Sequence, residues 1–330
     1  MSEGPASTMS GKSLGVKKGG VHVVQPGSYS AAESHYPRVV NAQLHPTVTQ
    51  FFSLTRGQMV ARYCQLHPEV SPGHLLAILR CSPRHFKWAG CDLFVCGPTR
   101  RTLVVETNSC PSGQKSLPFR DGDELNGYGR LICSAFASLL PAAGSRGKEE
   151  GVYAVLYDKN EMEARGYAGA LAEVTGEPVY LAEWFLTDPD PPLKWDAGAR
   201  LHVRSAAAGG AWLPVKAALR YVTQKPWTRM PVVPATPLLN PLLPCLAGGR
   251  NKMLAAKAYD ALNARLAAYT PLRLRTPLTL GDVGKAEVPS LVAKMGGCAV
   301  VKVPYGNAGQ GVYTITCPAE LSAFMAEPHA

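Results

Sequence analysis

The sequence predicts a mixed fold of the α+β (α/β) kind, and three patterns support this class. A strand, helix and strand pattern covers residues 152–181, a hairpin pattern covers 92–106, and a glycine-rich turn joins two β-branched runs over 300–315. Apolar residues alternate or run together in the strand segments and recur every three to four residues in the helical ones. With 330 residues, the chain is long enough for two or more domains and a sizeable core.

Composition indicates a globular protein, with 46% hydrophobic residues. No apolar run approaches the ~20 residues of a membrane span, so no membrane partner is expected. Residues 1–36 are rich in Ser, Gly and Lys, which predicts a disordered leader. A cytoplasmic location is expected. An organellar transit peptide stays open, although Glu3, Glu33 and the lack of arginine in this leader count against one.

The charge and cysteine patterns limit which binding partners and which compartment are expected. A net charge of +10 favours an anionic partner, but the lysines and arginines are scattered, which favours a phosphorylated small molecule over nucleic acid. None of the nine cysteines falls into a CxxC pair. The sequence therefore indicates neither a zinc site nor a disulfide framework, and a reducing compartment is expected.

Residues 37–81 have a helical pattern. Apolar residues recur three and four apart in Val48–Leu54 and again in Met59–Leu66, and Ser71 with Pro72 is a good start for a helix over Leu75–Leu79. We expect these helices to pack against a core and assign them no chemistry. The histidines of this region lack a second ligand at helical or turn spacing, so we interpret them as structural or solvated.

The hairpin over residues 92–106 turns at Gly97–Arg100 and ends in Glu106-Thr107-Asn108. Glu106 and Asn108 are two apart on an extended chain, so they point to one face and can offer two oxygens to a hard cation such as Mg²⁺. A solvated sheet edge is the other interpretation. The polar loop that follows, 109–116, suits an anion or carboxylate.

A lobe built on a strand, helix and strand comes next. Residues 125–140 form an amphipathic helix, 141–151 a linker, and 152–181 the βαβ unit of a small parallel sheet. The turn at 158–160 lacks glycine, so it does not look like a dinucleotide site, and we interpret the lobe as substrate-facing. A hairpin over 201–222 turns at Gly209-Gly210. The proline-rich span 226–244 is predicted to be a surface connection.

Two lysines mark the C-terminal third. Lys252 lies in the first turn of a helix opened by Gly248-Gly249-Arg250-Asn251, where a cation opposes the helix dipole, so either a bound anion or a solvated lysine explains it. Lys302 ends a strand before a glycine turn, which predicts a phosphate-covering hairpin or an ordinary hairpin. The loop is neither a P-loop nor a dinucleotide fingerprint, because it opens no helix.

Taken in chain order, these motifs resemble the ATP-grasp superfamily. They are Glu-x-Asn with a Ser/Gly loop, a βαβ lobe, Gly-Gly-Arg-Asn-Lys, and Val-Lys-Val-Pro with a glycine loop. Because Glu-x-Asn comes first rather than last, the chain is more similar to the circularly permuted branch, which includes eukaryotic glutathione synthetase and glutathionylspermidine synthetase. The resemblance covers roughly residues 88 to 316.

The resemblance implies ATP and Mg²⁺ as cofactors. Glu106 and Asn108 would hold magnesium on the ATP phosphates, and Lys302 and Lys252 would be the catalytic, phosphate-binding lysines, with Lys257 as the alternative to Lys252. The residues implied for the ATP lid are Gly306, Asn307, Gly309 and Gly311. Those implied for the carboxylate substrate are Ser109, Ser112 and Lys115.

Two departures from the family stand out. Glutathione synthetase carries an acid in the glycine loop as a third metal ligand, where this chain has Gly306 and Asn307. The family also continues past the loop into an adenine-facing strand, so we expect this chain to be a fragment or truncated. The expected units are the leader at 1–36, an N-terminal ATP-grasp part at 37–150, the substrate lobe at 151–235 and a partial nucleotide lobe at 236–330.

The implied activity is an ATP-dependent ligase that joins a small-molecule carboxylate to an amine through an acyl phosphate. The alternative is a catalytically degenerate or truncated family member that only binds. A nucleic-acid binder, attracted by the positive charge, is the third hypothesis; it requires retention on a polyanion with a steep salt dependence.

Overall fold

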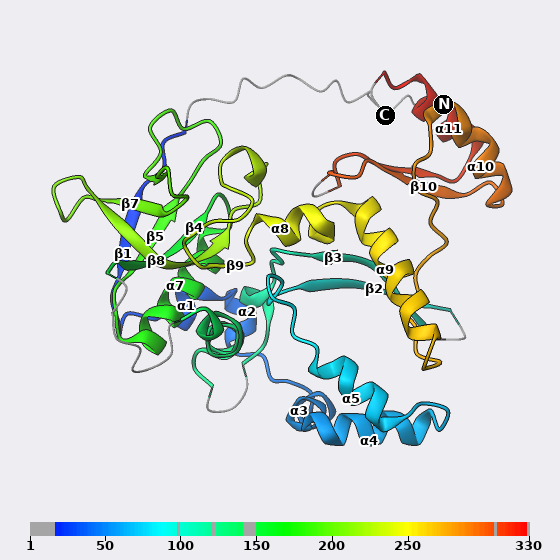
Figure 1. The fold of residues 1–330 in the computed structure, drawn as a ribbon, viewed down its shortest axis with the longest axis horizontal. Coiled ribbons are helices and arrows are strands. Elements are labelled where there is room, and N and C mark those ends of the chain that lie inside the picture. The colour runs from blue at the N-terminus through cyan, green and yellow to red at the C-terminus, as the bar shows by residue number, and fades with distance from the viewer. Residues whose placement is uncertain (1–16, 98–99, 120–122, 141–149, 307–308, 329–330) are drawn as a thin grey trace.

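The computed structural model describes residues 17–97, 100–119, 123–140, 150–306 and 309–328. The fold is a mixed α+β arrangement of one large sheet and two separate two-stranded hairpins (Figure 1). The described helices include none that is both long and apolar enough to cross a membrane.

The large sheet has seven strands and is mixed. Its centre is parallel, since β4 pairs in parallel with both β5 and β8, and β8 also pairs in parallel with β9. Antiparallel strands extend it on both sides. The expected small parallel sheet is therefore the middle of a larger one. Its order is β1 (Val21–Val24), β5 (Val179–Glu183), β4 (Val152–Tyr157), β8 (Ala211–Tyr221), β7 (Leu201–Ser205) and β6 (Leu193–Trp195), with β9 (Leu238–Leu239) beside β8.

The predicted βαβ unit is confirmed. Helix α7 (Glu161–Thr175) joins β4 to β5 and ends at Gly176, whose φ of 68° is the left-handed conformation that glycine adopts most easily. Small residues let α7 approach its neighbours closely. A Cβ on Gly166 would lie 2.4 Å from the ring of Tyr128, so this position accepts only glycine without movement of the ring.

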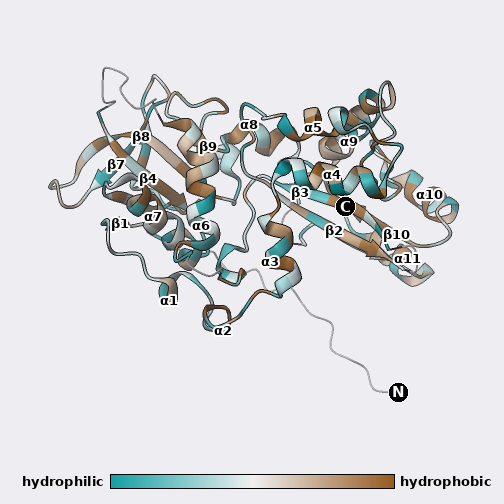
Figure 2. Ribbon diagram, turned by 90° about the horizontal axis from the view of Figure 1, so that it is seen from below, coloured by the Kyte–Doolittle hydropathy of each residue, from teal (hydrophilic) through white to brown (hydrophobic). Residues whose placement is uncertain are grey.

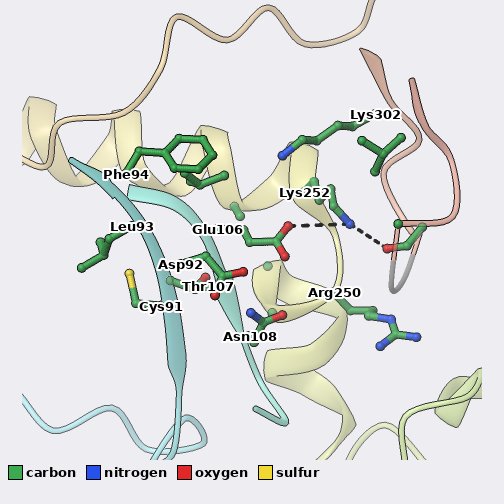
Figure 3. A pocket seen from close by; sticks show the side chains of 17 residues that line it. Cys91, Asp92, Leu93, Phe94, Glu106, Thr107, Asn108, Arg250, Lys252 and Lys302 are labelled. Carbon is green, nitrogen blue, oxygen red and sulfur yellow. Dashed lines mark hydrogen bonds and ion pairs between the residues drawn. The ribbon is translucent and has the colours of Figure 1, made fainter. Parts of the chain in front are cut away.

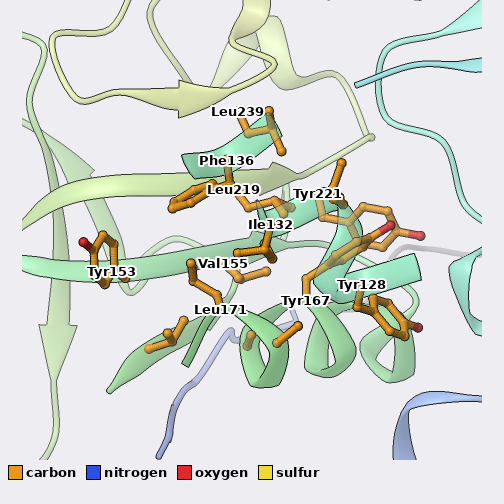
Figure 4. Close-up of a cluster of buried hydrophobic side chains, with 14 of the residues drawn as sticks. Tyr128, Ile132, Phe136, Tyr153, Val155, Tyr167, Leu171, Leu219, Tyr221 and Leu239 are labelled. Carbon is orange, nitrogen blue, oxygen red and sulfur yellow. The ribbon is translucent and has the colours of Figure 1, made fainter. Parts of the chain in front are cut away.

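The core between α7 and the sheet also contains the segment before the linker. Helix α6 (Asn126–Leu131), the π-helical turn η2 (Ile132–Phe136) and the 3₁₀ turn η3 (Ala137–Leu139) form the amphipathic helix predicted at 125–140. Tyr128, Ile132 and Phe136 are fully buried in one cluster with α7, β4 and β8 (Figure 4). A boundary at residue 150 therefore divides a single core, because the helix before it packs on the sheet after it.

The opposite face of the sheet is covered by the proline-rich span. It contains η4 (Pro226–Thr228), β9, α8 (Leu242–Pro244) and the π turn η5 (Cys245–Gly249). Met230, Leu238 and Leu242 are buried there against β8, and Figure 2 shows hydrophobic colouring along β4 and β8. The prediction of a surface connection is wrong, because the prolines flank β9 rather than interrupt it and so remove no ladder hydrogen bond.

The predicted disordered leader is wrong for the described part of 1–36. Strand β1 pairs antiparallel with β5, and helix α1 (Ala31–Ser34) begins at the N-cap Ser30. The Gly19 N–H also donates to Asp188 Oδ2 at 2.7 Å. The three valines of β1 are a strand signal that the surrounding Ser, Gly and Lys residues outweigh in composition, and the strand is ordered by backbone pairing with a strand far along the chain. Residues 1–16 lie outside the described residues.

Two hairpins lie beside the sheet lobe. The first, β2 (Gly90–Cys96) with β3 (Arg101–Asn108), is confirmed, although turn residues 98–99 lie outside the described part. The second, β10 (Ala299–Lys302) with β11 (Val312–Ile315), also forms as predicted. The elements around them are η1 (Gln114–Ser116), α9 (Lys252–Ala267), η6 (Lys285–Glu287), α10 (Val288–Lys294) and α11 (Pro318–Ala326).

A helical arm projects below the two hairpins in Figure 1. After the short α2 (Pro37–Val40), it consists of α3 (Pro46–Ser53), α4 (Arg56–Leu66) and α5 (Pro72–Arg80). Thr55 and Gln58 form a capping box that starts α4. The helices are confirmed, but the expected packing is wrong. Helices α3 and α5 bury no residue, and α4 buries only Val60.

Candidate active site

Two adjoining cavities lie where the hairpins meet the sheet lobe. The hairpin cavity, of about 580 Å³, lies between β2–β3, the start of α9 and β10–β11. The lobe cavity, of about 420 Å³, faces the end of the large sheet. They share one wall. The residues of that wall are Cys91, Asp92, Glu106, Asn108, Gly249 and Arg250.

The acidic side of the hairpin cavity comes from β2 and β3. Glu106 and Asn108 project from one face of β3, as the spacing predicts, and Asp92 stands directly opposite Glu106 in the register of β2 (Figure 3). Like charges opposite one another in a sheet are destabilising, so this pair favours a cation beside it. Sequence reasoning missed Asp92. The hairpin register counted back from the turn would not have found it, because a bulge between Asp92 and Leu93 shifts the pairing by one residue and brings Asp92, rather than Cys91, opposite Glu106.

Lys252 supplies a cation from the first residue of α9, whose N-cap Asn251 accepts from the Leu254 N–H. Its Nζ lies 3.8 Å from Glu106 Oε2 and donates to Gly306 O at 2.6 Å (Figure 3). Burial lowers the pKa of Lys252 below its ordinary value; nearby Lys302 and Arg250 act in the same direction, and Glu106 opposes them. The lysine thus connects the acidic strand end to the glycine loop.

The glycine loop closes the cavity from the side of β10. Lys302, Gly306 and Gly309 line it, while Gly311 lies behind it with a φ of 66° and no room for a Cβ beside Val303. Gly306 is also required by packing, since a Cβ there would lie 2.0 Å from Gln310 O. Asn307 lies outside the described residues. Some of the glycines are thus explained by the turn itself, so both interpretations of the hairpin remain.

The donor set at the shared wall fits a magnesium ion in company with a phosphate. Glu106, Asp92 and Asn108 present oxygens at one place, and Mg²⁺ is usually held by one or two carboxylates plus phosphate and water oxygens. Across the described ranges, no group of three or more His, Cys, Asp or Glu could hold a metal by itself. A metal here would therefore depend on oxygens brought by its ligand.

The lobe cavity is rich in cations. Arg220 is 1% exposed and donates to three backbone carbonyls, those of Asn240, Val222 and Ser109. Arg250 donates to Thr223 O at 2.7 Å, its buried Nε has no acceptor within the described structure, and burial lowers its pKa. Lys159 also lines this cavity. A buried cation without a carboxylate beside it is costly, so the cavity suits an anion.

The substrate residues implied by the resemblance are divided between this cavity and a network behind it. Ser109 and Ser112 line the cavity, whereas Lys115 is a lining residue of neither cavity in the described structure. Lys115 Nζ instead contacts Glu163 Oε2 at 3.0 Å. Glu163 also accepts from Ser112 Oγ, Tyr221 Oη and the N–H groups of the polar loop, all at 2.8 Å.

Glu163 was missed by sequence reasoning, because an acid in the first turn of a helix is common and gives no signal of a further role. Burial raises the pKa of this carboxyl, but the hydrogen bonds from Gly113, Ser112, Lys115 and Tyr221 outweigh that effect and lower it overall. Glu163 therefore fixes the polar loop and the floor of the lobe cavity from behind.

No protein-family model matches the chain, and no curated protein matches it either. The geometry of the two cavities and the order of the motifs are therefore the basis for a function.

Proposed function

We propose that the chain is an ATP-dependent ligase of the ATP-grasp kind, which joins a carboxylate to an amine through an acyl phosphate. One observation carries the proposal. Glu106, at the end of an early strand, and Lys302, at the end of a late one, line the same cavity together with Lys252 and the glycine loop. An acid, an amide and two lysines around a glycine loop are the groups that a triphosphate with its metal requires.

The hairpin cavity would take the triphosphate. Lys302 and Lys252 would contact phosphate oxygens, and Glu106, Asn108 and Asp92 would hold the magnesium. Bound there, the metal neutralises phosphate charge and orients the terminal phosphoryl group. Lys252 would exchange its present contact with Gly306 O for a phosphate oxygen, which moves the loop and the helix start together.

The lobe cavity would take the acid. Arg250, Lys159 and Ser112 offer donors to a carboxylate, and the shared wall brings that carboxylate to the phosphate end of the nucleotide. A carboxylate oxygen attacks the γ-phosphorus, the bond to the β-phosphate oxygen breaks, and ADP leaves. The amine then attacks the acyl carbon and displaces phosphate. The residues position and neutralise these groups, and the glycine loop excludes the water that would hydrolyse the acyl phosphate.

A family member that binds without turnover is the second candidate. It is favoured by the lack of an acid in the glycine loop, because Gly306 and Asn307 stand where the related enzymes have a metal-ligating acid. It predicts nucleotide binding that does not depend on magnesium. Dependence on magnesium therefore separates the two candidates.

The test is equilibrium binding of a non-hydrolysable ATP analogue with and without Mg²⁺, followed by ATP turnover screened over pools of carboxylates and amines. We expect Lys302→Ala to weaken binding by a factor of about 10 to 100, because a charge-assisted contact is worth roughly 1.5 to 3 kcal/mol. Glu106→Gln should remove the magnesium dependence.

Lys257→Ala is the matched control, because Lys257, the alternative to Lys252 in the resemblance, lies on the same helix but lines neither described cavity, is half exposed and pairs with Asp282. It should leave binding unchanged. Binding and turnover that survive both Lys302→Ala and Glu106→Gln would remove these residues from the mechanism.

A further inference from the structure

Helices α3 and α4 turn their apolar stripes toward solvent. On α3, Val48, Phe51 and Phe52 follow the three- and four-residue spacing of one helix face, and they are 38%, 51% and 58% exposed. On α4, Met59, Tyr63 and Leu66 form a second such stripe at 37%, 39% and 70% exposure. Both helices are therefore amphipathic with the apolar face uncovered.

Such helices need a partner surface on which their apolar faces can pack. Helices of 8 and 11 residues are marginal in water by themselves and normally gain their stability by packing an apolar face on something else. Within the described structure that packing is sparse. Val60 and Val70 are the buried residues of the arm, and the tip of α5 meets the body through a ring contact between His74 and Tyr269.

The arm and the residues that flank it are basic. Residues 37–87 hold six lysines and arginines against one acid, Glu69, so they carry +5 of the net charge of +10; within α3–α5 itself, residues 46–80, three arginines face that one acid, a charge of +2. Arg56 is three residues before Met59, on the same helix face, and Arg62 is four before Leu66. A partner surface that packs on these apolar faces therefore has to offer negative charge beside an apolar interior. The six cations are Arg38, Arg56, Arg62, Arg80, Arg84 and Lys87.

Two other partners that combine apolar surface with negative charge fit the arm less well than a flat anionic surface. A second copy of the chain would bring two basic arms together, which costs energy because like charges repel. An acidic protein groove encloses a target helix on most sides, but α4 already packs on α5 and offers one face only. A flat anionic surface needs one face and no groove.

We propose that the α3–α5 arm binds the surface of a lipid bilayer that contains anionic lipid. Phe51, Phe52 and Leu66 enter the boundary between headgroups and acyl chains, and Arg56 and Arg62 contact the anionic headgroups. Lying on a membrane requires no spanning helix, and the described chain has none. This inference is independent of the proposed ligase activity, since neither described cavity includes a residue of the arm.

Sedimentation of the full chain with vesicles tests it. We expect binding to vesicles of phosphatidylcholine mixed with phosphatidylserine and little to phosphatidylcholine alone. The double variant Phe51→Ala/Phe52→Ala should weaken binding at least about tenfold through lost apolar contact. Arg56→Gln/Arg62→Gln should weaken it by a factor of about 25, since each arginine near such a surface is worth roughly fivefold.

Matched variants outside the α3–α5 arm test whether losing any exposed apolar side chains or any exposed charges would weaken vesicle binding equally. Leu186→Ala/Val233→Ala removes exposed apolar side chains from the sheet lobe, and Arg200→Gln/Lys294→Gln removes two exposed charges. Both should bind vesicles as the unchanged chain does. The proposal is overturned if the unchanged chain does not bind the mixed vesicles, or if the body variants lose as much binding as the arm variants.

Discussion

Asp92 and Glu106 face each other across β2 and β3, and this pair of like charges lines the hairpin cavity together with the cations Arg250, Lys252 and Lys302. Lys252 is the nearest compensating cation, 3.8 Å from Glu106. A cavity wall that combines two acids, an amide and a lysine is poor as a purely structural arrangement. It becomes favourable when a cation and an anion bind together, which is how a metal–nucleotide complex would meet it.

Replacing Asp92 should have separate effects on the stability of the ligand-free protein and on its magnesium requirement. Asp92→Asn removes one of the two facing charges, so we expect the ligand-free protein to gain roughly a few tenths of a kcal/mol. If the wall holds magnesium, the same change should raise the Mg²⁺ concentration needed for half-maximal nucleotide binding. Chemical denaturation and a magnesium titration measure the two effects. A magnesium requirement that does not move would exclude Asp92 from the metal site.

Glu163 gives a second prediction at this scale. Glu163→Gln leaves Lys115 buried without its carboxylate, and breaking a buried pair in this way should cost roughly 3 kcal/mol. Glu161→Gln, on the same helix, is the control. Its partner Arg165 is exposed, so the change should cost about 0.5 kcal/mol or less. Equal losses in urea unfolding would show that the Glu163 network does not stabilise the loop.

The pH dependence of this network has a definite sign. The pKa of Glu163 in the folded protein lies below its ordinary value of 4.5, so its contribution to stability is complete above about pH 4.5. That contribution is lost as the pH falls through the lower, folded pKa. Urea unfolding between neutral and acid pH should therefore show a smaller acid loss in Glu163→Gln than in the unchanged chain.

At the scale of elements, the junction between β3 and η5 sets the shape of both cavities. The Ser109 N–H donates to Gly249 O at 3.4 Å, and a Cβ on Gly249 would lie 2.3 Å from the Cβ of Ser109. Thus the end of β3 and the segment that leads into α9 meet without space for a side chain. A small shift here would move Asn108 away from Lys252.

Gly249→Ala tests that junction. The added methyl forces the two backbones apart, which should cost about 1 to 3 kcal/mol and weaken nucleotide binding. Gly57→Ala on the exposed helix α4 is the control, because nothing lies within 4 Å of its Cβ position. It should be neutral or stabilising by roughly 0.5 kcal/mol. Thermal unfolding and nucleotide titration compare the two, and a Gly249→Ala protein with unchanged binding would contradict this role.

At the scale of the whole molecule, the packing is uneven. The sheet lobe holds two large buried clusters on the two faces of the sheet, whereas the part around β10 and β11 has a small one made of Val288, Val292, Ile315 and Phe324. A two-stranded hairpin over a small cluster opens more easily than a central strand. The part proposed to close over the nucleotide is therefore the less stable one.

Hydrogen exchange should report this difference. We expect amides of Ala299–Lys302 to exchange at least about a hundredfold faster than those of Val152–Tyr157, which pair on both sides. Under the proposed function, Mg²⁺ with an ATP analogue should slow exchange in β10 and β11 and leave Leu193–Trp195 unchanged. Uniform exchange across the chain would show one cooperative unit instead.

The sequence by itself determined the local elements that short-range chemistry specifies. Turn glycines fixed the 201–222 hairpin, periodicity located the βαβ unit, and the Gly-Gly-Arg-Asn-Lys motif located the start of α9. It also identified Glu106, Asn108, Lys252 and Lys302 as candidates, because an acid and an amide two apart on a strand suit a hard cation and lysines at a helix start and before a glycine turn suit phosphate.

Only the tertiary structure decided what those elements meet. Strand β1 was missed because it is ordered by pairing with a strand far along the chain. Asp92 was missed because only the bulged register of the hairpin places it opposite Glu106. Glu163 was missed because its hydrogen-bond donors come from a loop distant in the sequence. Whether an amphipathic stripe is covered depends on the surfaces available to it, and the α3–α5 arm remains uncovered. Periodicity encodes which side of a helix is apolar, whereas burial depends on contacts between residues far apart in the chain.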